Sequence, residues 1–146
     1  VAAAGHRVAM LELGIAGMPQ YAIDQRELAP NATGYTYDTL VALRAELGPN
    51  VPLVVLIGTD QYEKLDSWHR SRELFSLCRF AVFGRPEAGG ASAQPPPAGV
   101  VHVEMDPMPI SSTDIRARVA RGDDVSGVVP VPVLRSIQRH HLYGHR

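Results

Sequence analysis

A run of five apolar residues, Leu53-Val54-Val55-Leu56-Ile57, constrains the fold more than any other stretch of the chain. Several of these residues are β-branched and the run stops at Gly58, so its length favours a strand over a helix. An apolar run without alternation is typical of a strand buried on both faces, as found inside a parallel sheet. We therefore expect a strand over 53–57 that belongs to an α/β fold.

The residues after this strand, Gly58-Thr59-Asp60, have two interpretations. In open α/β sheets, ligands bind just beyond the carboxyl ends of the strands. Gly58 would let a ligand approach the backbone closely, and Asp60 would offer a carboxylate to a hydroxyl group. Alternatively, Thr59 or Asp60 merely caps the next helix. This stretch alone leaves both interpretations open.

Composition excludes several classes of protein. The chain of 146 residues is long enough for one domain over 1–146 with its own core. A net charge of −1 argues against a general nucleic-acid binder, which would be strongly basic. The single cysteine, Cys78, excludes an internal disulfide and fits a reducing compartment. No apolar run reaches membrane-spanning length and no signal peptide opens the chain, so we expect a cytoplasmic protein without membrane contact.

Further elements alternate along the chain. Hydrophobic periodicity predicts a helix over 6–17, a short strand at 21–23, a helix that begins near Thr36 as N-cap, and strands at 80–83 and 100–104. Residues 87–99, rich in Ala, Gly, Ser and Pro, predict a flexible loop. Strands that alternate with helices indicate a Rossmann-like parallel sheet flanked by helices.

Three other segments carry candidate binding residues. The helix start at Tyr35-Thr36 would present free backbone N–H groups to an anion, although from this segment alone simple capping is the favoured interpretation. Trp68 is either a core residue or a stacking platform for a planar ring, and His69 follows it. Arg85 follows the strand at 80–83 and would be well placed to meet a phosphate.

The segment Ser111-Ser112-Thr113-Asp114-Ile115-Arg116 has the pattern of a capped helix start. Hydroxyl groups, free N–H groups, the helix dipole and the Arg116 guanidinium would together form an anion site. The alternative is a well-capped helix with a solvated arginine. A metal site at the histidines 140, 141 and 145 is not expected, because no carboxylate or cysteine spacing completes a ligand shell. If the strand ends meet at one sheet edge, the candidate residues would surround a crevice suited to a nucleotide.

Together these motifs resemble bacterial nicotinate mononucleotide adenylyltransferases, members of the α/β nucleotidyltransferase superfamily. The resemblance covers nearly the whole chain. It rests on residues 34–40, on 56–60 with Trp68-His69, on Arg85-Pro86, on 110–116 and on 142–144. The pairing of the strand end at 56–60 with Trp68-His69 and with 110–116 is specific, whereas 110–116 alone would be shared with other adenylyltransferases.

The resemblance implies transfer of AMP from ATP, accompanied by Mg²⁺, to nicotinate mononucleotide. The nicotinate ring would stack near Trp68, with its carboxylate received by backbone N–H groups around Thr36 and His69, next to Tyr35. Gly58 and Asp60 would hold the adenosine ribose, and Arg85 would approach the mononucleotide phosphate. The ATP phosphates would be held at the helix start by four residues of the segment 110–116, namely Ser111, Ser112, Thr113 and Arg116.

One departure from the family is important. The family's first strand and its GGTFDPxHxGH turn are absent from these 146 residues, and with them the two histidines most directly tied to the transferring phosphate. We therefore expect a fragment that is inactive or nearly so, with no catalytic histidine of its own. The histidines 69, 140 and 141 do not stand at positions that could substitute.

Two alternatives remain open from the sequence. One is a sister adenylyltransferase with another acceptor, which binding of nicotinate against nicotinamide mononucleotide would distinguish. The other is a non-catalytic nucleotide-binding module. A homo-oligomer is also compatible with the sequence, because a partner would cover the sheet edge left by the missing strand.

Overall fold

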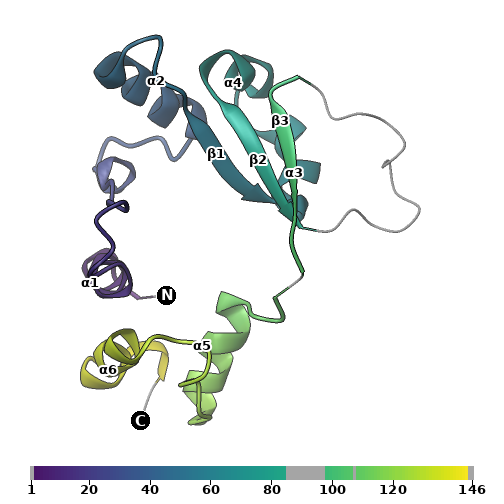
Figure 1. Cartoon of the computed structure of the whole chain (residues 1–146). Helices are drawn as coiled ribbons and strands as arrows, with labels where there is room; N and C mark the ends of the chain where they lie inside the picture. The colour runs from purple at the N-terminus through teal and green to yellow at the C-terminus, as the bar shows by residue number, and fades with distance from the viewer. Residues whose placement is uncertain (1, 85–97, 107, 145–146) are drawn as a thin grey trace. The chain divides into compact units, whose positions relative to one another are not determined.

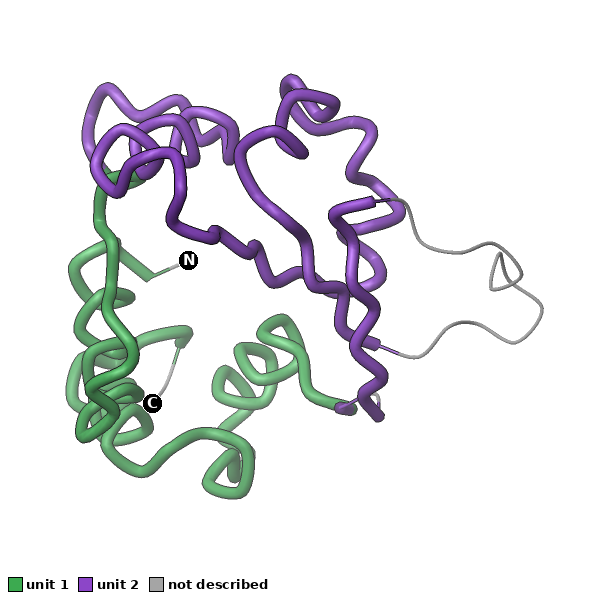
Figure 2. The backbone as a smooth tube through the Cα atoms, turned by 45° about the horizontal axis from the view of Figure 1, so that its top comes forward, with its two compact units in different colours: residues 1–28, 109–146 green, residues 29–108 purple. Residues whose placement is uncertain are grey.

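A computed structural model describes residues 2–84, 98–106 and 108–144 of the chain. The chain divides into two compact units, which Figure 2 distinguishes by colour. Unit 1 comprises residues 1–28 and 109–146, so both ends of the chain belong to it, and unit 2 comprises residues 29–108. Each unit is described by itself below.

Unit 2 is built on a three-stranded sheet of β1 (Val54–Gly58), β2 (Arg79–Gly84) and β3 (Val100–Glu104), visible in Figure 1. The strands lie in the order β1-β2-β3 and both pairs are parallel. Leu56 pairs with Ala81, and Ala81 pairs with Val101, which places these three residues in one row across the sheet. The predicted strands at 53–57, 80–83 and 100–104 are therefore confirmed.

Helices cover one face of this sheet. They are α2 (Thr36–Leu47), α3 (Thr59–Glu63) and α4 (Ser71–Leu77), with the 3₁₀ turn η2 (Leu65–Ser67) before α4. The core between helices and sheet consists of buried side chains from α2, η2, α4 and β2, packed on Val55 and Ile57 of β1: Leu40, Leu65, Leu74, Cys78 and Phe80. The predicted Rossmann-like arrangement of parallel strands flanked by helices is confirmed for this unit.

The other face of the sheet differs from the prediction that the strand at 53–57 is buried on both faces. Successive side chains of a strand point to opposite faces, and Val54 and Leu56 remain 52% and 66% exposed. Val101, in the same row as Leu56, is 57% exposed. An apolar run of five residues predicts a strand, but it cannot say whether packing covers one face or two.

The start of α2 differs from the prediction by one residue, and the helix ends at a glycine. Tyr35, not Thr36, is the N-cap residue, and it provides no side-chain cap. Thr33 takes that role, because its hydroxyl accepts the Tyr35 N–H at 3.3 Å and donates to the Asp38 carboxylate at 2.5 Å. The prediction of Thr36 as N-cap is thus wrong by one residue. At the other end, Gly48 adopts φ 89° and ends the helix.

Unit 1 contains α1 (Ala4–Gly14), η1 (Arg26–Leu28), α5 (Ser112–Arg121), α6 (Val131–Arg139) and η3 (Leu142–Gly144). Its core lies among α5, α6 and the segments around them: Val119, Val125, Val129, Ile137 and Leu142. Met10 of α1 packs against this core.

Two sequence predictions for unit 1 need correction. The helix predicted over 6–17 is present but begins at Ala4 and ends at Gly14. Residues 21–23 do not form a strand; Tyr21 is 57% exposed and its N–H donates to the Met18 carbonyl in a turn. A short apolar triplet does not form a strand unless it pairs with a neighbouring strand. Within the described ranges, no helix is long and apolar enough to cross a membrane.

Candidate functional site

The first group of candidate residues lies at the carboxyl end of β1. Gly58 is the N-cap of α3, and a side chain at its position would meet open space, so a ligand can reach the backbone there. Asp60 lies in the first turn of α3 and is exposed. Neither Thr59 nor Asp60 caps the helix with its side chain. The interpretation of these residues as simple caps is therefore not what the structure shows.

Thr59 has a packing role instead. Gly84, at the end of β2, has φ 148°, and a Cβ added to it would lie only 2.9 Å from Thr59 Oγ1. The carboxyl ends of β1 and β2 thus approach each other closely, with glycine as the residue that permits it. Arg85, the candidate that follows Gly84, lies outside the described residues, as does most of the predicted loop at 87–99.

The second group joins the start of α2 to the turn before α4. The His69 ring stacks on the Tyr35 ring with centroids 4.2 Å apart and an angle of 17° between the planes. Tyr37 meets the same imidazole edge-on at 6.1 Å. Thr36 and Tyr37 belong to the first turn of α2, whose backbone N–H groups have no acceptor within the helix. The structure therefore brings Tyr35, Thr36 and His69 together.

Trp68 packs on the core of unit 2, as one of its two interpretations predicts. Its indole packs against the core of unit 2 and meets the Phe80 ring edge-on, with centroids 6.4 Å apart. The side chain is only partly buried, so part of the indole remains accessible. A ring fixed at one edge by the core and open elsewhere is suited to stack on a planar ligand.

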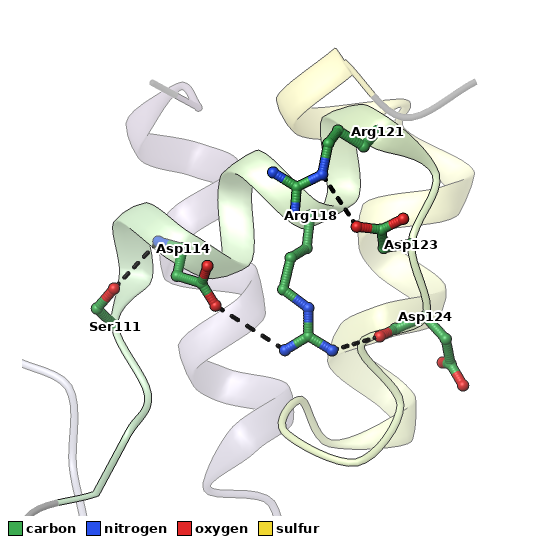
Figure 3. Close-up of polar contacts among 6 residues, drawn as sticks. All are labelled: Ser111, Asp114, Arg118, Arg121, Asp123 and Asp124. Carbon is green, nitrogen blue, oxygen red and sulfur yellow. Dashed lines mark hydrogen bonds and ion pairs between the residues drawn. The ribbon is translucent and has the colours of Figure 1, made fainter.

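The third group lies at the start of α5, in unit 1. Ser111 is the N-cap, and its hydroxyl accepts the Asp114 N–H at 3.1 Å (Figure 3). The predicted cap is confirmed. Arg116 Nη2 lies 3.4 Å from Thr113 Oγ1, and the hydroxyl residues 111–113 are all exposed. Free N–H groups, hydroxyls and a guanidinium at one helix start can hold the oxygens of a phosphate.

Arg118 ties the first turn of α5 to the segment that follows the helix. Figure 3 shows Arg118 between the Asp114 carboxylate, at 3.9 Å, and the Asp124 carbonyl, to which it donates at 2.7 Å. Gly122 ends the helix in the left-handed conformation with φ 81°. These contacts hold the helix and its following turn without engaging Arg116.

Three described residues have pKa values that their surroundings shift. Burial raises the pKa of the Cys78 thiol to about 11, which Arg44 partly opposes. The Ser126 N–H holds the pKa of the Asp124 carboxyl below its ordinary value, and hydrogen bonds from Arg26 do the same for the pKa of Asp24.

Several of the described histidines lie against other aromatic rings. The His6 and His140 rings are tilted by 43° with centroids 4.6 Å apart, while Tyr35 and Tyr37 contact the His69 ring. Among the described residues, no group of three or more His, Cys, Asp or Glu side chains could hold a metal ion.

Sequence reasoning missed Tyr37 and Arg70. The Arg70 guanidinium lies over the Tyr37 ring, 4.4 Å from its centroid, and pairs with Glu73 at 3.0 Å. The only available signal was the position of Arg70 directly after Trp68-His69, because the aromatic residues it joins are distant in sequence.

Comparison with known proteins shows the family to which this chain belongs. The model of the cytidylyltransferase-like family matches residues 1–118. A probable nicotinate-nucleotide adenylyltransferase of Laribacter hongkongensis is 41% identical over 97% of this chain and 73% of its own length. The protein of the same description from Streptomyces coelicolor is 40% identical over 98% of this chain and 76% of its own length.

A solved structure supports the fold independently. The Plasmodium falciparum nicotinic acid mononucleotide adenylyltransferase complexed with NaAD matches 100% of this chain and 77% of its own chain, with a TM-score of 0.76. The sequence identity is 18%, so this match establishes the fold. The same protein complexed with APC gives the same TM-score of 0.76.

Proposed function

Because the chain belongs to the cytidylyltransferase-like family and, within it, to the nicotinate-nucleotide adenylyltransferases, we propose that it serves adenylyl transfer from ATP to nicotinate mononucleotide. The products are deamido-NAD and pyrophosphate, and the reaction belongs to NAD biosynthesis. The observation that carries the proposal is the 41% identity to such a protein over 97% of this chain. With its one cysteine buried as a thiol, the chain suits the reducing cytoplasm.

On the acceptor side, the accessible part of the Trp68 indole would stack on the nicotinate ring. The N–H groups at the start of α2, around Thr36, and that of His69 would receive its carboxylate, with Tyr35 beside them. Arg85 would pair with the mononucleotide phosphate. Support for this assignment comes from the stacking of Tyr35 on His69, which holds the two backbone segments close together.

On the ATP side, the open backbone at Gly58 and the exposed Asp60 carboxylate would bind the adenosine ribose. The ATP phosphates would lie at the start of α5, on the hydroxyls and N–H groups of residues 111–113 and on Arg116. Mg²⁺ would arrive as part of the MgATP substrate, on phosphate oxygens and water.

The chemistry needs no nucleophile from the protein. A phosphate oxygen of the mononucleotide attacks the α-phosphorus of ATP, a new P–O bond forms, and the bond to the β-phosphate oxygen breaks to release pyrophosphate. The chain's own contribution would be to hold the two substrates in line and to neutralise the phosphate charge. A carboxamide in place of the nicotinate carboxylate would leave the receiving N–H groups poorly paired, which gives selectivity for the acid.

A binding titration tests the proposal without requiring turnover. Trp68 is the only tryptophan, so its fluorescence reports directly on the acceptor ring. We expect nicotinate mononucleotide to quench it, and nicotinamide mononucleotide to bind about tenfold or more weakly, a difference of about 1.4 kcal/mol. No quenching by either mononucleotide would contradict the proposal, and equal affinities would favour the sister enzyme with another acceptor.

A turnover assay addresses catalysis separately. Residues 1–146 contain no His-x-Gly-His sequence. We therefore expect a protein of these residues alone to bind both substrates but to form pyrophosphate far more slowly than a protein that includes the motif. A coupled pyrophosphate assay with saturating MgATP and mononucleotide measures this, and comparable rates for the two proteins would refute the expectation.

A further inference from the structure

Arg70 has a backbone conformation that arginine rarely adopts. It is the N-cap residue of α4, with φ 53° and ψ 42° in the left-handed region. For a residue with a Cβ this conformation costs free energy, and it persists only where surrounding contacts impose it. A glycine would meet the same backbone requirement without that cost, so the side chain of Arg70 must contribute something that glycine cannot.

The contacts of the guanidinium show what holds this turn. The guanidinium lies 4.4 Å from the centroid of the Tyr37 ring, and its Nη2 is 3.0 Å from Glu73 Oε2. The Glu73 N–H also donates to the Arg70 carbonyl at 2.9 Å. Tyr37 packs against the core of unit 2, so the aromatic face on which Arg70 lies is fixed.

The neighbouring residue, His69, continues the same network. Its ring lies between the Tyr35 face at 4.2 Å and the edge of Tyr37 at 6.1 Å. The side chains therefore follow one another in a continuous series that ties the start of α2 to the turn before α4: Tyr35, His69, Tyr37, Arg70 and Glu73.

We propose that Arg70 is a positioning residue for the acceptor: its guanidinium, held on Tyr37 and Glu73, fixes the turn that aims the His69 N–H at the nicotinate group. The identity of the ligand rests on the proposed function above, whereas the network itself is a property of the free chain. Arg70 acts through His69 and is not assigned a contact with the reacting atoms.

A purely structural role is a weaker explanation. The Arg70 and Glu73 side chains are 48% and 50% exposed, and exposed ion pairs contribute little to global stability. Trp68 is held separately by Phe80 and the core. Loss of the guanidinium should therefore leave the fold intact and release mainly the His69 ring and the backbone beside it.

The first experiment needs no ligand. In the free chain, the Tyr35 ring shifts the His69 ring protons upfield in the NMR spectrum, because the two rings are stacked. We expect Arg70→Ala to reduce this shift, and Arg70→Gly to reduce it equally although glycine removes the backbone strain. Arg72→Ala, which removes an exposed arginine from the first turn of the same helix, is the matched control and should leave the shift unchanged. An unaltered His69 shift in Arg70→Ala would overturn the proposal.

The second experiment measures Trp68 fluorescence during titration with nicotinate mononucleotide and, separately, calorimetry with MgATP. When only a fraction of the protein molecules can bind, the apparent dissociation constant equals the intrinsic constant divided by that fraction. We expect Arg70→Ala and Arg70→Gly to weaken mononucleotide binding by about fivefold, Arg70→Lys to recover part of this loss, and MgATP binding to be unchanged. Far-UV circular dichroism confirms that each variant is folded.

The outcomes separate the two levels of inference. If the unaltered chain does not bind the mononucleotide, the proposed function fails, and the His69 shift still decides whether Arg70 fixes the turn. If the unaltered chain binds and the Arg70 variants bind equally well, the proposed function stands and the role of Arg70 is refuted. Equal weakening of mononucleotide and MgATP would also refute it, because that pattern indicates general destabilisation.

Discussion

Arg44 connects three backbone segments of unit 2, and its replacement gives the sharpest test of how that unit is held together. Its guanidinium donates to the Gly48 carbonyl at 3.2 Å, to the Val51 carbonyl and to the Leu77 carbonyl at 2.7 Å. It thereby closes the end of α2 and links it to the end of α4 and to the approach to β1. The bonds to Gly48 and Leu77 are partly buried.

The magnitude follows from those two carbonyls. In Arg44→Met the apolar stem is retained but each partly buried carbonyl loses its donor, at about 1–2 kcal/mol apiece. We expect a loss of about 2–4 kcal/mol in the free energy of unfolding of unit 2. With a urea dependence of about 2 kcal/mol per M, the midpoint falls by about 1–2 M.

Urea unfolding followed by Trp68 fluorescence is the appropriate assay, because the indole packs against the core of the same unit. Arg72→Met is the matched control, because Arg72 is exposed. Its free energy of unfolding should change by no more than about 0.5 kcal/mol. Arg44→Lys should fall between the two, because an ammonium cannot reach all three carbonyls with the geometry of the guanidinium. A midpoint for Arg44→Met that matches the control would refute the reasoning.

Three further experiments test other parts of the structure. Ser111→Ala should destabilise α5 by about 1 kcal/mol, seen as faster exchange of the Asp114 amide hydrogen; unchanged exchange would contradict the cap. Cys78, with its pKa raised to about 11 from 9.0, should react with a disulfide reagent about 100-fold more slowly at pH 8 than an ordinary thiol. Because burial raises the pKa of the folded thiol, the stability that the neutral thiol contributes is fully present below about pH 9 and is lost as the pH rises toward about 11. A thiol that reacts at the ordinary rate in the folded chain would disprove this. Gly84→Ala should cost about 1–3 kcal/mol through its clash with Thr59 and its φ of 148°, with part recovered in Thr59→Ala/Gly84→Ala; a thermal midpoint equal to that of the unaltered chain would rule out the close approach.

The regular elements could be predicted from the sequence because local signals determine them. The apolar run at 53–57, the serine cap at Ser111 and the glycine that ends α5 each depend on a few neighbouring residues, and all three are found in the structure. The exposure of Leu56 could not be predicted, because it depends on which packing layers cover the sheet. The strand expected at 21–23 failed for a related reason, since a strand requires a partner that the triplet itself does not specify.

In the candidate site too, some features could be predicted from local sequence and others depend on the fold. Residue type drew attention to Trp68, and the family resemblance added Tyr35 and His69, but the stacking of Tyr35 on His69 joins residues 34 positions apart and follows only from the fold. Arg70 gave no conformational signal, because arginine is not a residue that favours left-handed backbone. That one ATP molecule contacts both the end of β1 and the start of α5 stays a prediction.

That prediction is the central claim, and NMR titration of the ¹⁵N-labelled chain with MgATP tests it most directly. The amide signals of Gly58 and Asp60, in unit 2, and those of Ser112 and Thr113, in unit 1, are followed in the same samples. We predict that all four shift along curves with one common dissociation constant, and that Arg116→Ala weakens all of them together. Shifts confined to one of the two groups, or two distinct dissociation constants, would contradict the account.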